Sequence, residues 1–381
     1  MTAIYIGSDN IVSPLGLTTA ENFSRLTENI SGVKEQDDAA MSEQPFYAAL
    51  FEKGQDFVQN GQQAGLSRFE NLLITSISDA LEKSPVNASD EKTVLIISST
   101  KGNISLLETE PYNRELQTRI SLNTSAKLVA EYFGFINKPV IVSNACISGL
   151  LAILTGMRLI RSGQFEHAVI AGADVITKFV LSGFQSFQAI SSSPCKPFDA
   201  ARNGINLGEG AATVIISSHK NNSCGIKVSG GSVSNDANHI SGPSRTGEEL
   251  KLAISNAMHA AGLSSADIDF ISAHGTATVY NDEMEAKALT LAGLQSVPVN
   301  SLKGYYGHTL GAAGLIESVI AIQSLKENMV VPTLGFETMG VTQPVNVCTT
   351  LLQKPLNNCL KTASGFGGCN AAMIFSKDYS D

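Results

Sequence analysis

The sequence lacks several features that would each have indicated a class of protein. No apolar run is long enough to cross a bilayer, and the first residues carry no basic cluster of the kind that opens a signal peptide. The six cysteines, at positions 146, 195, 224, 348, 359 and 369, form no CxxC pair and no metal-ligand spacing, which argues against structural zinc and a disulfide framework. We therefore expect a cytoplasmic chain with free thiols.

Positive charge is also scarce. The net charge of −9 argues against nucleic acid as a partner and gives no attraction to an acidic membrane surface. This balance still leaves room for a local basic patch.

Apolar residues, in contrast, are abundant. The 381 residues are 43% hydrophobic and 16% charged, which is typical of a globular protein with a large buried core. This length suits two ordinary domains or one large α/β unit built from two similar halves. No repeat is evident at the residue level, so any similarity between halves is architectural.

Strand and helix patterns alternate along the chain. The expected strands are 3–6, 93–97, 140–142, 167–170, 212–216, 226–228, 268–271, 297–299 and 371–375. The expected helices start at 18 or 19, 67, 124, 247, and 281 or 282, with another that runs through 325. Residues 184–190 are interpreted as a loop or short helix, and 361–370 as a turn followed by the glycine loop FGG. The alternation predicts parallel sheets with functional groups at the carboxyl ends of strands.

One stretch, KPVIVSNACISGLLAILTGMRLIR at 138–161, predicts a buried strand, a tight turn and a helix that starts at or just after Cys146. Unpaired N–H groups and the positive end of the helix dipole would favour the thiolate form of this cysteine. Cys146 is therefore a candidate nucleophile. Taken alone, however, the stretch favours a packed thiol, because free cysteine is among the most buried residue types.

Two histidines follow predicted strands in glycine-containing loops, His274 in AHGTAT and His308 in GHTLGAAG. Either one alone is more often a hydrogen-bonded core residue. Together with a cysteine at a helix start they suit acyl transfer, in which a thiolate attacks a thioester and imidazoles stabilise developing negative charge.

Lys303 lies five residues before His308, between a strand and a glycine. Its alternatives are a surface position and a buried position that needs a carboxylate partner. Glu317, within the apolar helix pattern GAAGLIESVIAI, is the candidate partner. Structural pairing and tuning of an active site are both open for this pair.

These segments together resemble the β-ketoacyl-(acyl carrier protein) synthases of the elongating, two-histidine type. The matching segments are SNACISG, AHGTAT, NSLKGYYGHTLGAAG and FGG at 366–368, supported by IVSPLG near the start, KPFDAARNGINLGEGAA at 196–212 and HGTATxxxDxxE ending in Asp282 and Glu285. They occur in the order of the family and cover nearly the whole chain. The resemblance implies the thiolase-like αβαβα fold of two related halves, residues 1–217 with the cysteine and residues 218–381 with the histidines.

The resemblance also implies a role for each matching residue. Cys146 would carry the acyl chain as a thioester, while His274 and His308 would hold the malonyl thioester and assist its decarboxylation. The backbone N–H groups of Cys146 and Phe366 would form the oxyanion hole, next to Gly367, and the Phe366 ring would gate access to the thiol. The remaining supporting residues would be Thr276 and Thr278 near the malonyl group, and Lys303 with Glu317, which would order the site.

The family chemistry further implies partners and cofactors. Acyl- and malonyl-loaded carrier proteins would be the partners, and the chain would form a homodimer or a heterodimer with a related ketosynthase. Decarboxylation generates the carbanion without a strong base, so no metal and no organic cofactor are expected.

Several positions depart from the family pattern. TVYND at 278–282 replaces TPxGD, Cys369 replaces a threonine, and Ser364 stands where a second phenylalanine often precedes the gate. Residues 101–138 also look shorter than in the fatty-acid enzymes. These departures fit a ketosynthase of an aryl-polyene or flexirubin-type pigment pathway better than housekeeping fatty-acid elongation.

Two other functions stay open at this point. A non-catalytic chain-length-factor-like partner of another ketosynthase would share the fold, but such partners typically lack the nucleophile, which argues against this reading for a chain with Cys146. A thiolase or initiating synthase would use a Cys-His-Asn or Cys-His-Cys set, and the GH pair at 307–308 after Lys303 fits the elongating type better.

Overall fold

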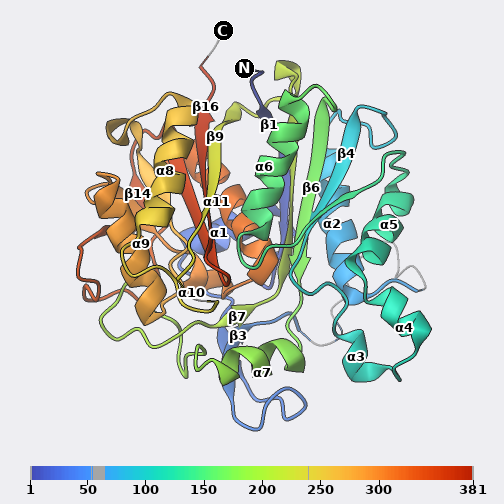
Figure 1. Cartoon of the computed structure of the whole chain (residues 1–381), viewed down its shortest axis with the longest axis horizontal. Helices are drawn as coiled ribbons and strands as arrows, with labels where there is room; N and C mark the ends of the chain where they lie inside the picture. Colours follow the sequence, from blue (N-terminus) through green and yellow to red (C-terminus); the bar gives the residue numbers. More distant parts are fainter. Residues whose placement is uncertain (1, 53, 55–64, 239, 380–381) are drawn as a thin grey trace.

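The computed structural model describes residues 2–52, 54, 65–238 and 240–379 (Figure 1). Its large mixed sheet has the spatial order β13, β11, β10, β15, β16, β9, β1, β8, β6, β4, β5. The bounds of these strands are β1 Tyr5–Val12, β4 Thr93–Ser98, β5 Val140–Val142, β6 His167–Asp174, β8 Gly210–Ser217, β9 Ile226–Asn235, β10 Phe270–Ser272, β11 Pro298–Asn300, β13 Asn346–Val347, β15 Asn358–Gly365 and β16 Cys369–Lys377.

Two smaller sheets complete the strands. One joins β2 (Lys34–Gln36), β3 (Phe46–Ala49) and β7 (Leu207–Gly208), and the other joins β12 (Met329–Val330) and β14 (Leu352–Gln353). The helices are α1 Thr19–Thr27, α2 Arg68–Glu82, α3 Leu106–Thr109, α4 Arg114–Arg119, α5 Leu122–Phe133, α6 Ser148–Arg161, α7 Lys178–Ser186, α8 Glu248–Ala261, α9 Val279–Leu291, α10 Lys303–Tyr306 and α11 Ala313–Glu327.

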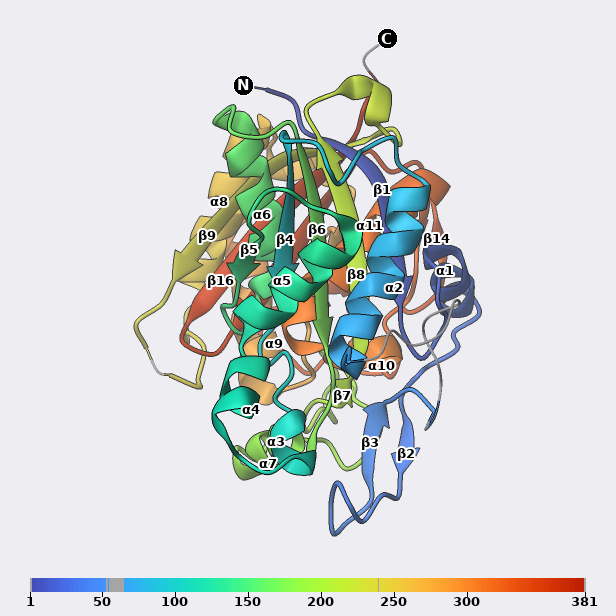
Figure 2. The same cartoon turned by 90° about the vertical axis from the view of Figure 1, so that its right-hand side faces the viewer.

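The elements form five layers. Helices α6 and α11 pack against each other in the middle, α2 and α5 cover one outer face (Figure 2), and α8 and α9 cover the other (Figure 1). Strands β1, β4, β5, β6 and β8 belong to one half of the sheet, and the halves meet where Tyr5 of β1 pairs with Lys227 of β9. The predicted thiolase-like αβαβα fold is thus confirmed. The boundary between residues 217 and 218 stays a prediction.

The sheet differs from the expectation of purely parallel strands. Parallel pairs lie toward both edges, but β1, β6 and β8 pair antiparallel, as do β9, β15 and β16. Strands β15 and β16 are joined by a short turn at residues 366–368, and strands joined so closely must run antiparallel.

Local signals explain some of the helix starts. Thr18 and Glu21 form a capping box at α1, as do Ser67 and Glu70 at α2, so two predicted starts are confirmed. The sequence prediction is wrong for β15, because it assigns no element to residues 358–360 and interprets the rest of this strand as a turn. It is incomplete for α7, which starts at Lys178, before the segment 184–190 interpreted as a loop or short helix. None of the helices in the described ranges combines the length and apolar character that a membrane span needs.

Candidate active site

Cys146 lies in the turn between β5 and α6 and is 9% exposed. The turn is held by Ser148, whose hydroxyl accepts from the Asn144 N–H at 2.8 Å and donates to the Ala145 carbonyl at 2.7 Å. Ala145 adopts φ 45°, in the left-handed region. A residue other than glycine in this region marks a constrained turn, and here the constraint places the cysteine at the head of the helix.

His274 follows β10. Its backbone N–H donates to Glu285 Oε1 at 2.9 Å, and the Gly275 N–H donates to Oε2 of the same carboxylate at 2.8 Å. Gly275 has φ 43°, and a Cβ there would lie 2.6 Å from Ser301 Cβ. Glycine is therefore required for this turn, and Glu285 of the HGTATxxxDxxE segment is the clamp that holds it.

His308 is held by the segment 206–208 from the N-terminal part of the chain. Its N–H donates to the Asn206 carbonyl at 2.7 Å, and its carbonyl accepts from the Gly208 N–H at 3.1 Å. Gly307 has φ 64°, and a Cβ there would come within 2.3 Å of the Leu207 carbonyl. The conspicuous stretch KPFDAARNGINLGEGAA thus includes the backbone that supports the second histidine.

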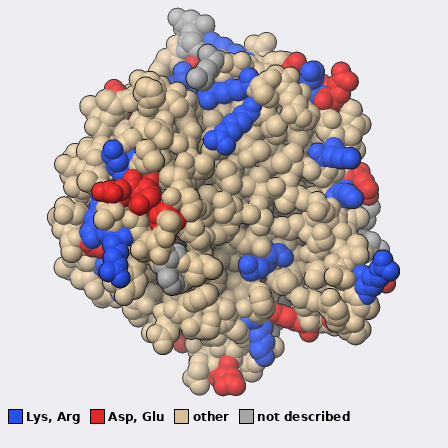
Figure 3. Space-filling view, in the orientation of Figure 1, with Lys and Arg blue, Asp and Glu red and all other residues tan. Residues whose placement is uncertain are grey.

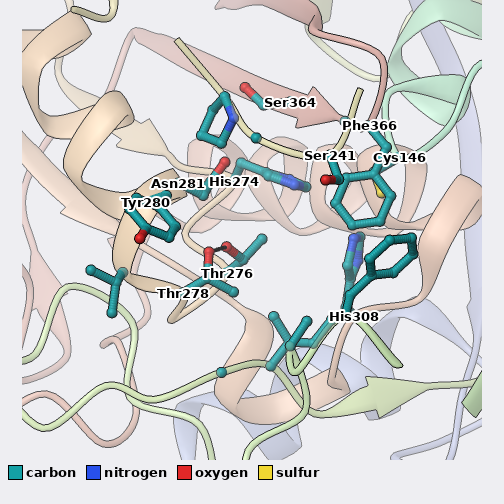
Figure 4. A pocket seen from close by; sticks show the side chains of 18 of the residues that line it. Cys146, Ser241, His274, Thr276, Thr278, Tyr280, Asn281, His308, Ser364 and Phe366 are labelled. Carbon is teal, nitrogen blue, oxygen red and sulfur yellow. Dashed lines mark hydrogen bonds between the residues drawn. The ribbon is translucent and has the colours of Figure 1, made fainter. Parts of the chain in front are cut away.

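The three loops bring Cys146, His274 and His308 together (Figure 4). One nitrogen of each imidazole and the Cys146 Sγ atom all lie within 4.8 Å of one another. The imidazole rings meet edge to face at 81°, with centroids 5.3 Å apart, and each histidine is only 2% exposed. A thiol and two imidazoles therefore share one buried site.

The pKa of the Cys146 thiol is raised, whereas its place near a helix start predicts a lowered pKa. Burial raises the pKa of Cys146 to about 12, Cys369 adds to this increase, and Lys303 opposes it. The expected stabilisation of the thiolate was therefore wrong for the resting site, because loss of solvent outweighs the favourable charges.

This pKa predicts how Cys146 reacts with an alkylating reagent. With the thiol form dominant, the rate of carbamidomethylation of Cys146 by iodoacetamide should rise roughly tenfold per pH unit across the range from pH 7 to 10. Peptide mass spectrometry after timed labelling measures this rate. A rate that levels off below pH 9 would show that the thiolate is already formed at rest.

Both imidazoles are uncharged at neutral pH. Burial lowers the pKa of His274 well below its usual value, and Lys303 and His308 lower it further. Burial and then Lys303 lower the pKa of His308 in the same direction. The Nδ1 atoms of both rings are buried and find no hydrogen-bond partner within the described part of the chain. Neutral imidazoles at this place can donate a hydrogen bond to a developing negative charge.

A buried ion cluster lies behind the histidines. Lys303 Nζ contacts Glu317 Oε1 and donates to the His274 carbonyl at 3.0 Å. Lys361 Nζ lies 2.8 Å from Glu317 Oε2. The sequence interpretation missed Lys361. The only signal was a lysine inside a segment whose neighbours alternate between apolar and small polar residues, and such a signal does not identify a partner.

Phe366 lies in the turn between β15 and β16 and is 40% exposed. Its ring stacks on Phe184 at 5.9 Å and meets Phe187 edge to face at 5.4 Å. These two α7-region rings, which the sequence interpretation did not single out, line with Phe366 a pocket of about 380 Å³ that reaches Cys146. Its walls also include Thr276 and Thr278, whose hydroxyls are 2.9 Å apart.

The backbone around Phe366 lies against the cysteine turn. A Cβ on Gly365 would lie 2.9 Å from the Cys146 backbone nitrogen. Cys369 Sγ donates to the Phe366 carbonyl at 3.4 Å, and the Gly367 N–H donates to the Ile240 carbonyl at 2.7 Å. The Phe366 turn is thus tied both to its own hairpin and to the loop after β9.

Among the described residues, two groups of donor atoms have spacings that a metal ion could bridge. The first is Cys146 with the two histidines, where the ammonium groups behind the imidazoles disfavour a divalent cation. The second, at the far end of β6, has other partners: His219 Nε2 lies 3.1 Å from Glu166 Oε2, and His167 Nδ1 lies 2.9 Å from Ser217 Oγ.

Two protein-family models match most of the chain. Residues 4–222 match the model described as beta-ketoacyl synthase, N-terminal domain, and residues 226–337 match that of the C-terminal domain. The chain belongs to the beta-ketoacyl synthase family. It is accordingly an acyltransferase of the condensing type.

Several relatives of this ketosynthase match it over nearly its whole length. The 3-oxoacyl-(acyl-carrier-protein) synthase 2 of Vibrio cholerae is 29% identical over an alignment of 403 positions, gaps included, which covers 96% of this chain and 97% of that protein. A chain from the structure of a ketosynthase in complex with its chain length factor, from Xenorhabdus doucetiae, is 25% identical with a TM-score of 0.87 and 99% and 98% coverage. The ishigamide ketosynthase/chain length factor matches with a TM-score of 0.90 at 22% identity over 99% of both chains, and supports the fold alone.

Proposed function

We propose that this ketosynthase joins an acyl chain on Cys146 to a malonyl unit on acyl carrier protein, with loss of carbon dioxide. The observation that carries the proposal is the meeting of one thiol and two neutral imidazoles in a buried pocket. Each of the three side chains comes from a different loop, so no single local motif explains why they lie together.

The first step is transfer of the acyl group. Cys146 Sγ attacks the thioester carbonyl, the bond to the carrier thiol breaks, and the thiol proton ends on the leaving sulfur. Because burial keeps Cys146 protonated at rest, the proton must move during the attack. A neutral imidazole within 4.8 Å is placed to take the proton and return it to the leaving thiolate.

The second step is condensation. The C–C bond to the malonyl carboxylate breaks, carbon dioxide leaves, and the electron pair passes into an enolate at the thioester. Hydrogen bonds from His274 and His308 stabilise the negative charge that develops on the thioester oxygen. The enolate carbon then attacks the acyl carbonyl, the Cys146 thiolate leaves, and a proton from solvent restores the thiol.

The supporting residues complete this assignment. The N–H groups of Cys146 and Phe366 form the oxyanion hole, a role supported by the close approach of Gly365 to the Cys146 nitrogen. Thr276 and Thr278 contact the malonyl arm, and Phe366, next to Gly367, gates the pocket. Lys303 and Glu317 order the loop of His274.

The carrier protein and a second ketosynthase chain are the proposed partners. Relatives named 3-oxoacyl-(acyl-carrier-protein) synthase support the carrier, and a ketosynthase solved with its chain length factor supports a paired assembly. We propose a homodimer in the cytoplasm, with two thiolase-like halves at 1–217 and 218–381. The face of Figure 3 carries both signs of charge around a largely uncharged middle.

The substrate proposal is an unsaturated or aryl-containing chain of a polyene-type pigment pathway. It is supported by the ring cluster of Phe184, Phe187 and Phe366, because aromatic faces stack well on planar conjugated groups. The mass of the acyl group on Cys146, after expression with the native carrier protein, tests this proposal. A short saturated chain there would contradict it.

The histidine roles predict a split between the two steps. His274→Ala and His308→Ala should each lower condensation by roughly a hundredfold or more, because they remove a donor that acts in decarboxylation. Each should retain some acylation of Cys146, because the other imidazole can still move the thiol proton. Intact-protein mass after incubation with acyl carrier reports acylation, and release of carbon dioxide from malonyl carrier reports the second step. His259→Ala, on the exposed side of α8, is the matched control. Equal loss of both steps would reject the assignment.

An obligatory heterodimer remains the alternative assembly, with this chain as the catalytic or chain-length-factor-like half. It would show as a purified chain that is inactive until a related ketosynthase is added. Cys146 and both histidines in one pocket favour the catalytic half.

A further inference from the structure

Lys361 is a charged residue in the middle of strand β15, and its side chain is completely buried. Its backbone pairs with Ser272, the last residue of β10. Its ammonium group donates to the carbonyls of Ser272 and Ala273, each at 3.1 Å, and of Thr362 at 2.7 Å. The side chain therefore reaches across the strand pair to the point where β10 ends.

Backbone pairing stops at this point and leaves carbonyls that need other donors. The pairing of β10 with β11 and β15 ends at Ser272, followed by one more backbone hydrogen bond from the Ala273 N–H to the Asn300 carbonyl at 2.8 Å, and His274 is the next residue. Lys361 binds the carbonyls of Ser272 and Ala273, while Lys303 binds the carbonyl of His274. Three consecutive carbonyls that lead into the histidine loop are thus held by two ammonium groups.

Glu317 connects the two ammonium groups. One oxygen of its carboxylate contacts Lys303 and the other lies 2.8 Å from Lys361. A second carboxylate, Glu285, accepts from the backbone N–H groups of His274 and Gly275 in the same loop and also from the Thr362 hydroxyl at 2.6 Å. The loop is therefore clamped by charged groups from α9, α10, α11 and β15.

Burying an ammonium group costs several kcal/mol, and a well-packed apolar side chain in a strand would avoid that cost. A neutral residue at this place could not pair with Glu317, and an apolar residue could not donate to the carbonyls either. Such an arrangement is expected where the direction of a neighbouring side chain must be held closely.

We propose that Lys361 is a positioning residue of the condensing site: its ammonium group fixes the end of β10, and with it the direction in which the His274 imidazole faces Cys146. The inference rests on the proposed function, because it assigns Lys361 to the decarboxylation step that His274 serves.

The charge of Lys361 has a second effect on the imidazoles. After burial and Lys303, it contributes to the lowered pKa of both His274 and His308. The other charged or titratable groups around the rings are Lys303, Glu317, Glu285 and Cys146. Removing the positive charge of Lys361 makes protonation of the imidazoles easier, so their pKa rises. The acid limb of the decarboxylation rate should then move to higher pH.

The test compares Lys361→Met with Lys361→Arg, and with Lys127→Met as a matched loss of one exposed lysine on α5. Lys361→Met should lower the kcat of condensation roughly ten- to hundredfold through misplacement of the imidazole, with KM for malonyl carrier within about twofold. Its acid limb should shift upward and acylation of Cys146 should persist. Lys361→Arg, which keeps the charge, should restore the acid limb, and Lys127→Met should match the wild type.

A folded Lys361→Met variant with wild-type kcat and an unmoved acid limb would overturn the proposal, as would a variant that loses only thermal stability. If Lys361→Met does not fold, Lys361→Gln takes its place, since glutamine can still donate to both carbonyls but lacks the charge. Histidine titration by nuclear magnetic resonance needs no turnover, so it tests the effect on His274 even if the wild type proves unable to condense malonyl carrier. An unchanged His274 titration in a neutral variant would then reject the inference by itself.

Discussion

Cys146→Ala is expected to abolish acylation of the chain and to lower condensation by more than about a thousandfold, because no other group in the pocket can carry the acyl thioester. The pocket that reaches Cys146 is lined by no second cysteine among the described residues. Intact-protein mass after incubation with acyl carrier measures the loss of the covalent intermediate. The mass of the product on the carrier measures the loss of condensation.

The control for this variant is Cys348→Ala. Cys348 is a half-buried free thiol that follows β13 and does not line the pocket. Its removal should leave acylation and condensation within about twofold of the wild type. Substantial condensation by Cys146→Ala would reject the assignment of the nucleophile, even if the rest of the fold is intact.

Glu317→Ala is expected to give the largest loss of stability. The substitution leaves the ammonium groups of Lys303 and Lys361 without their carboxylate in a site that solvent does not reach. Breaking a buried ion pair from one side typically costs about 3 to 5 kcal/mol. We expect a loss of this order in the free energy of unfolding, measured by chemical denaturation.

Two further variants make the Glu317 prediction specific. Glu327→Ala removes an exposed carboxylate from the same helix, α11, and should change stability by less than about 0.5 kcal/mol. Adding Lys361→Met to Glu317→Ala removes one of the stranded charges, so the double variant should be more stable than Glu317→Ala alone. The buried cluster would not have the energetic role described here if Glu317→Ala were as stable as Glu327→Ala.

Much of the fold follows from local sequence. The starts of α1 and α2 are each specified by a hydroxyl residue and a glutamate three residues apart. The side chain of each accepts a hydrogen bond from the backbone N–H of the other, so no distant residue is needed. Strands such as β4 and β6 are fully buried, and each contains a continuous run of apolar or small residues between polar ends. Their pattern is therefore visible without knowledge of their neighbours.

Strand β15 illustrates where this approach fails. Its sequence, NCLKTASG, combines one lysine with small and polar residues, so it lacks the apolar pattern of a buried strand. Yet residues 359–364 are all buried. The buried lysine is stabilised by backbone carbonyls and by Glu317, which is 44 positions away along the chain and supplies the opposite charge. A partner so remote leaves no local signal.

Residue types in short segments of the sequence predicted the family, the order of its motifs and the candidate reacting groups Cys146, His274 and His308. The ionisation of these groups depends on packing, which the short segments do not specify. The helix start favoured a thiolate, but burial outweighs it and keeps Cys146 as a thiol. Burial and the distant charges of Lys303 and Lys361 likewise keep both imidazoles neutral. Solvent exclusion and long-range charge are properties of the packed molecule, and no spacing in the sequence encodes them.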